Sequence, residues 1–176
     1  MVLKVEFKSK HWLDGYNHNK EHITPTWGSI ASLDKKFLKK HSNVKKICEI
    51  GTGSGKSTKA LGKYNAEIHT IDMFDHGAEL IPKTAKFYFM HSTHFWKTYN
   101  VSGFNLYFID ANIKFVDAKE IFKRATDNFK IIFHDYRGED KGVQNHKMMI
   151  RYLFDKCHTE ESTGGKCCSL IECEKI

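Results

Sequence analysis

Three glycines at alternate positions are the residues of this chain whose spacing first suggests chemistry. The apolar run Ile47–Ile50 leads into Gly51, Gly53 and Gly55, and Lys56-Ser57-Thr58 follows. Glycine permits positive φ angles and a close approach of the backbone to a ligand, while the start of a helix offers free N–H groups. The segment therefore predicts a strand, a turn and a helix that together bind a nucleotide-like molecule.

Two kinds of nucleotide-binding loop have sequences similar to this segment. A phosphate-binding P-loop needs G-x-x-x-x-G-K-[ST], and counting back from Gly55-Lys56-Ser57 puts Ile50 where the first glycine belongs. Isoleucine resists the positive φ angles available to glycine, which counts against a P-loop. The pattern E-x-G-x-G-x-G is met in full from Glu49, and Asp72 ends the next apolar run. In a nucleotide-binding β-α-β unit, the end of the second strand carries the carboxylate that binds the ribose hydroxyls.

With this loop and Asp72, the chain resembles the class I S-adenosylmethionine-dependent methyltransferases over roughly residues 24–176. The resemblance implies S-adenosylmethionine as the cofactor, with Asp72 on its ribose hydroxyls. The loop residues expected at the methionine and ribose end of that cofactor are Glu49, Gly51, Thr52, Gly53, Ser54 and Gly55. From their location beside the expected pocket, Met73 or Phe74 is predicted to form an apolar wall against the adenine, and Ser92 is predicted to form a hydrogen bond with the adenine edge.

The resemblance also implies an α/β, Rossmann-like methyltransferase fold. Its mostly parallel seven-stranded sheet would end in a C-terminal antiparallel hairpin, with Gly164-Gly165 as the turn, and helices would cover both faces. The expected strands are 46–50, 67–72, 86–90, 104–109, 130–134, 157–162 and 167–174. The expected helices are 26–41, 55–64, 77–82, 93–99, 115–127 and 141–155. One domain, 1–176, is predicted, with a basic helical segment over 1–45 and the cofactor-binding core over 46–176.

Polar residues follow two further apolar runs. Asp110 ends the run from Phe104, and His134-Asp135 follow Ile131–Phe133. Ligands of open α/β sheets bind at the carboxyl ends of the strands, and histidine is a suitable base near neutral pH. Asp110, His134 and Asp135 are therefore predicted to face the methyl acceptor and to be the catalytic residues, with Asp110 also beside the cofactor.

The sequence Phe-His-Asp-Tyr from Phe133 is similar to a subgroup of small-molecule O-methyltransferases that includes sugar-modifying members. In related metal-dependent enzymes, acids matching Asp110 and Asp135 bind a divalent ion, which implies Mg²⁺ here. The subgroup commonly has D-G-x-H-x-Y from the first acid, whereas Ile113 and Phe115 replace its polar members in this chain. That departure counts against the metal.

Composition limits the partners. The 176 residues carry a formal net charge of +7, and residues 1–46 hold ten lysines against four acids. Such a segment either steers an anionic substrate or is a solvated helix surface. A small-molecule acceptor is expected, while nucleic acid and a homo-oligomer stay open. No apolar run approaches a membrane span, so a cytoplasmic location is expected.

These patterns predict methyl transfer from S-adenosylmethionine to oxygen of a small molecule, with nitrogen as the second choice. One alternative is a P-loop kinase or NTPase, with Lys56 and Ser57 on phosphates and Asp110 on magnesium. Another is a domain that binds the cofactor but is catalytically silent, which Ile113 and Phe115 suggest.

Overall fold

The structure, a computed structural model, describes residues 4–6, 39–41, 43–74, 81–111, 114–125, 129–134, 152, 157–161 and 170–175. The strands are β1 (Lys4–Glu6), β2 (Lys46–Ile50), β3 (Glu67–Asp72), β4 (Lys86–Phe89), β5 (Leu106–Ile109), β6 (Lys130–His134), β7 (Cys157–Glu161) and β8 (Leu170–Lys175). The helices are α2 (Lys56–Leu61), α3 (Ser92–Thr98) and α4 (Lys114–Arg124), with 3-10 turns η2 (Lys39–His41) and η3 (Gly62–Tyr64).

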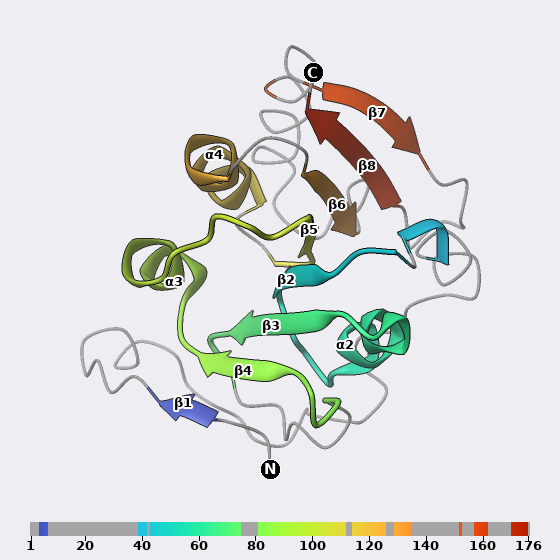
Figure 1. Ribbon diagram of the computed structural model, residues 1–176. Coiled ribbons are helices and arrows are strands. Elements are labelled where there is room, and N and C mark those ends of the chain that lie inside the picture. Colours follow the sequence, from blue (N-terminus) through green and yellow to red (C-terminus); the bar gives the residue numbers. More distant parts are fainter. Residues whose placement is uncertain are drawn as a thin grey trace.

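Across the described residues the strands form one sheet in the order β1-β4-β3-β2-β5-β6-β8-β7 (Figure 1). The first six are parallel, whereas β8 runs antiparallel to both β6 and β7. The prediction of seven strands was wrong, because β1 adds an eighth beside β4. With three residues and two charges, β1 lacks the apolar run that marked the other strands. The expected turn at Gly164-Gly165 lies outside the described residues.

The predicted bounds agree best in the middle of the sheet, where β2 and β3 span 46–50 and 67–72 as expected. The helix expected over 55–64 divides into α2 and η3, with Gly62 as the C-terminal cap of α2. The helix expected over 77–82 lies mostly outside the described residues. So do the helices expected over 26–41 and 141–155.

Two hydrophobic cores lie on opposite faces of the sheet. Along β5, Leu106 and Phe108 point into one core, and Tyr107 and Ile109 into the other. Parallel strands that are buried on both faces have continuous apolar sequences, which is why these strands could be predicted from the sequence. In Figure 1, α3 and α4 lie on one side of the sheet and α2 lies on the other. None of the helices in the described ranges is long and apolar enough to cross a membrane.

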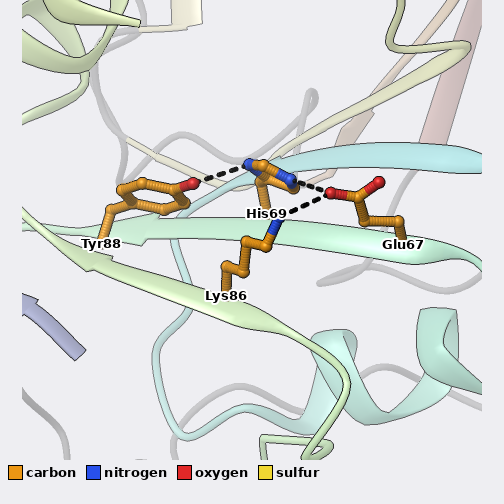
Figure 2. A network of polar contacts seen from close by, with 4 residues as sticks. All are labelled: Glu67, His69, Lys86 and Tyr88. Carbon is orange, nitrogen blue, oxygen red and sulfur yellow. Dashed lines mark hydrogen bonds and ion pairs between the residues drawn. The ribbon is translucent and has the colours of Figure 1, made fainter. Parts of the chain in front are cut away.

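A polar network of four side chains, the amino-end network, extends along β3 and β4 from their first residues, Glu67 and Lys86 (Figure 2). Its other members are His69 and Tyr88, each the third residue of its strand. Glu67 Oε1 accepts from Lys86 Nζ at 2.8 Å and lies 2.7 Å from His69 Nε2. Because a carboxylate only accepts, Nε2 carries the hydrogen, so Nδ1 of the neutral ring accepts from the Tyr88 hydroxyl at 2.9 Å. Burial lowers the pKa of His69, which favours this neutral ring.

Candidate functional site

The glycine loop follows β2 at the carboxyl edge of the sheet. Gly51, Gly53 and Gly55 have φ angles of 94°, 50° and 80°. A Cβ at Gly51 would overlap the carbonyl oxygen of Asp110 and lie 2.8 Å from its carbonyl carbon, so glycine is required there by both backbone angle and space. At Gly53, by contrast, no heavy atom lies within 4 Å of that position. The loop therefore packs tightly at its start and is open at its centre.

Hydrogen bonds attach this loop to β3. The Gly51 amide donates to the Ile71 carbonyl at 2.8 Å, and the Gly53 amide donates to Asp72 Oδ2 at 2.8 Å. The other oxygen, Asp72 Oδ1, accepts from the Phe74 amide at 2.9 Å. Two backbone amides thus orient the Asp72 carboxylate at the open edge beside the loop.

Glu49 lies beneath the loop with none of its surface exposed. Its Oε2 accepts from the hydroxyls of Thr58 at 2.5 Å and Thr70 at 2.6 Å. Burial raises the pKa of Glu49 to about 7, and the charge of Asp110 acts in the same direction, while hydroxyl hydrogen bonds oppose the shift. This carboxyl group contacts the protein interior rather than the edge of the sheet.

The remaining loop residues divide between interior and surface. Thr52 is buried, and its hydroxyl lies 2.6 Å from that of Thr70. Its carbonyl accepts from the Gly55 amide at 2.9 Å, which closes the turn. Ser54 is half-buried. Ile50, where a P-loop needs its first glycine, is the last residue of β2 and part of the core.

Asp110 and His134 come together on neighbouring strands β5 and β6. Asp110 Oδ1 lies 3.2 Å from His134 Nδ1, and their side chains are 16% and 5% exposed. The ring of His134 lies beside Phe108, with the ring centroids 6.0 Å apart. The Asp110 amide donates to the Ile50 carbonyl at 2.8 Å, which places this pair next to the loop. Asp135, the third predicted catalytic residue, lies outside the described residues.

Two of the residues predicted at the adenine follow neighbouring strands. Met73 comes directly after β3 and is half-buried, and Ser92 is the first residue of α3 and is buried. The Met90 amide donates to the Asp72 carbonyl at 2.9 Å, which joins the ends of β3 and β4. Both residues are therefore at the same edge as the loop, and their contacts with a cofactor remain predictions.

Within the ranges that the structure describes, no three His, Cys, Asp or Glu side chains are arranged to hold a metal ion. Asp110 belongs to those ranges, whereas Asp135 does not. The Mg²⁺ site at these two acids remains a prediction.

Thr58 and Thr70 were missed by the sequence analysis. Both are fully buried, and Thr70 pairs with Glu49 in the register between β3 and β2. Thr70 is a polar residue inside an apolar strand, which was the available signal. Its partner became evident only from the strand register.

No protein-family model matches the sequence, and no curated protein matches it either. Solved structures do match. The O-methyltransferase TomG of Streptomyces achromogenes, involved in tomaymycin synthesis and solved with S-adenosylmethionine, has a TM-score of 0.68 at 15% identity, covering 84% of this chain and 82% of that one. An O-methyltransferase of Bacillus cereus solved with S-adenosylhomocysteine has a TM-score of 0.68 at 16% identity, covering 84% and 83%.

A tRNA (m1A58) methyltransferase of Aquifex aeolicus also matches, with a TM-score of 0.61 at 15% identity over 84% of this chain and 70% of that one. The chain therefore has the Rossmann-like fold of S-adenosylmethionine-dependent methyltransferases. None of these three structures supports the P-loop alternative. Since one neighbour is named for tRNA, the fold leaves the acceptor open.

Proposed function

We propose that this chain is a methyltransferase that uses S-adenosylmethionine and modifies an oxygen of a small molecule. The observation that carries the proposal is the loop attached to β3, in which the Gly53 amide bonds the Asp72 carboxylate at the open edge. Ligands of open α/β sheets bind at this edge. The fold shared with O-methyltransferases supports the same conclusion.

The charge around the loop favours this cofactor over a nucleotide triphosphate. Asp72 and Asp110 bring two carboxyl groups to the loop and the strand end beside it. Negative charge there repels phosphates and attracts the sulfonium and ammonium groups of S-adenosylmethionine. A carboxylate such as that of Asp72 accepts hydrogen bonds, as the ribose hydroxyls of the cofactor require.

Bound S-adenosylmethionine supplies a methyl group on a positively charged sulfur that is open to in-line attack. The residues of this chain then have to align the acceptor and take its proton. Asp110 orients His134 through the 3.2 Å contact with Nδ1. When the neutral ring carries its hydrogen on Nδ1, Nε2 is the basic atom that takes the proton of the acceptor hydroxyl. The roles of Asp135 and Mg²⁺ on the acceptor side are predictions from the sequence.

Calorimetric titration tests the cofactor site. S-adenosylmethionine and S-adenosylhomocysteine should bind the purified chain, and Asp72→Ala should weaken both by roughly 10- to 100-fold, since hydrogen bonds to a charged group are lost. Glu67→Ala is the matched control, because it removes a carboxylate from the other end of the same strand. Binding of Mg-ATP alone would refute the proposal in favour of a P-loop enzyme.

Turnover tests the catalytic assignment. With an acceptor hydroxyl compound that supports methylation, His134→Gln should lower kcat by about 100-fold or more and leave the Kd of S-adenosylhomocysteine nearly unchanged. Phe115, a residue that suggested the silent domain, packs edge-on against Tyr152 with ring centroids 5.7 Å apart, so its apolar character serves the core. Tight cofactor binding with no methyl transfer to any hydroxyl compound would favour the silent domain.

A further inference from the structure

A buried polar cluster lies directly beneath the glycine loop. Its four members, the loop network, are Glu49 of β2, Thr52 of the loop, Thr58 of α2 and Thr70 of β3. A carboxyl group without exposed surface is costly unless hydrogen bonds compensate it. Here two hydroxyls bond the same oxygen, Glu49 Oε2. This cluster therefore connects β2, the loop, α2 and β3 through side chains alone.

The direction of each hydrogen bond follows from the donors present. A threonine hydroxyl has one hydrogen, and Thr70 donates its hydrogen to Glu49 at 2.6 Å. In the 2.6 Å contact between the hydroxyls of Thr52 and Thr70, Thr52 must therefore be the donor. The bonds run from Thr52 to Thr70 to Glu49, and Thr58 donates to the same carboxyl oxygen from the other side. Glu49 is the acceptor on which the whole network depends.

The network fixes the part of the loop that borders the proposed cofactor site. Three consecutive residues each bond to β3: the Gly51 amide to the Ile71 carbonyl, the Thr52 hydroxyl to Thr70, and the Gly53 amide to Asp72. Thr70 and Asp72 lie two positions apart on one strand, so their side chains share a face of the sheet. Loss of the middle attachment would leave the flanking amides with fewer constraints.

We infer that Glu49 and Thr70 are positioning residues, which hold the Gly51–Gly53 segment in the conformation that binds the adenosyl cofactor without touching the cofactor themselves. Both side chains are fully buried, so their contribution to binding passes through Thr52 and the loop backbone. The inference rests on the proposed function and assigns to Glu49 an indirect role in place of the direct contact expected from the sequence.

The test compares Thr70→Val, which removes the hydroxyl at nearly constant volume, with Tyr107→Phe. Tyr107 donates a buried hydrogen bond to the Val101 carbonyl at 2.7 Å on the other face of the sheet, so both changes remove one buried hydroxyl. Thr70→Val should weaken S-adenosylhomocysteine about tenfold, and Tyr107→Phe should change its Kd less than twofold. Thr70→Ser, which keeps the hydroxyl, should bind within about threefold of wild type.

A double-mutant cycle and amide exchange complete the experiment. If Glu49 acts through Thr70, then Glu49→Gln combined with Thr70→Val should weaken binding no more than the more severe single change. In the cofactor-free protein, the Gly51 and Gly53 amides should exchange faster in Thr70→Val than in Tyr107→Phe.

The possible outcomes distinguish a failure of the positioning role from a failure of the proposed function. Thermal destabilisation of Thr70→Val with unchanged affinity and unchanged exchange would overturn the positioning role and leave a purely structural network. Failure of the wild-type protein to bind either adenosyl compound would refute the proposed function, whereas the exchange comparison would still test the positioning role. If Thr70→Val does not fold, Thr52→Val against Tyr107→Phe provides the same comparison, because it removes the other hydroxyl of the Thr52–Thr70 contact.

Discussion

Two polar networks involve β3, and they place carboxyl groups in opposite surroundings. In the loop network at the carboxyl end, Glu49 is fully buried and bonded by neutral hydroxyls, and burial raises its pKa to about 7. In the amino-end network (Figure 2), hydrogen bonds from His69 and Lys86 lower the pKa of Glu67 to about 2. The side chain of Glu67 is 44% exposed. The comparison teaches that solvent access and the charge of the partners, rather than residue type, decide what a carboxyl group contributes.

The largest expected effect comes from the loop itself. Gly51→Ala should lower the free energy of unfolding by at least about 3 kcal/mol, since the new Cβ meets the Asp110 carbonyl and the φ angle of 94° is unfavourable for alanine. Gly103→Ala is the matched control: its φ is 89°, and no heavy atom lies within 4 Å of the new Cβ. The control should lose only about 1–2 kcal/mol in urea denaturation. Equal losses of unfolding free energy in the two variants would show that the steric overlap with Asp110 adds nothing to the cost at Gly51.

The next effect is a pH dependence at Glu49. Its folded pKa of about 7 exceeds the ordinary value of 4.5, so the folded state holds a proton that the unfolded state releases between these values. Glu49 therefore reduces stability as pH rises from about 4.5 to about 7, by about 3 kcal/mol in total. The stability of Glu49→Gln relative to wild type should rise over that window. Denaturation curves at several pH values measure the difference, and parallel pH profiles would contradict the assignment.

A smaller effect is expected at Tyr88 in the amino-end network. Tyr88→Phe removes the hydroxyl that donates to His69 Nδ1 and leaves that partly buried acceptor without its donor. The cost should be about 1 kcal/mol in the free energy of unfolding. The affinity for S-adenosylhomocysteine should stay the same, because the lost hydroxyl bonds His69, three residues before Asp72 on β3. A changed affinity would mean that the two ends of the strand are coupled.

The smallest effect is expected for the exposed ion pair. Glu67→Gln should cost less than about 1 kcal/mol at pH 7, because solvent screens the contact with Lys86, and the cost should shrink in high salt. Because the folded pKa is depressed, this contribution is present above the ordinary value of 4.5 and is lost as pH falls toward about 2. The free energy of unfolding of wild type and Glu67→Gln, measured at low and at high salt, tests the expected salt dependence. A cost that salt leaves unchanged would indicate packing rather than charge.

Much of the fold could be predicted because its signals are local. The bounds of β2 and β3 followed from apolar runs that parallel strands need when both faces are buried. Strand β1, which lies at the edge of the sheet among the described strands, was missed because it has only three residues and two of them are charged. The expectation for His134 was incomplete in a similar way: its place at the end of β6 was predicted, while its burial beside Phe108 depends on packing from β5.

By itself, the sequence determined the central strands, the position of the loop and the acid that follows it, because each of these is encoded in contiguous residues. Only the tertiary structure decided which side chains meet. Glu49 and Thr70 lie twenty-one residues apart and pair through the register of β2 and β3, and a slip of one residue would turn Thr70 to the opposite face. Likewise, the need for glycine at position 51 depends on the carbonyl of Asp110, which a separate strand brings against it.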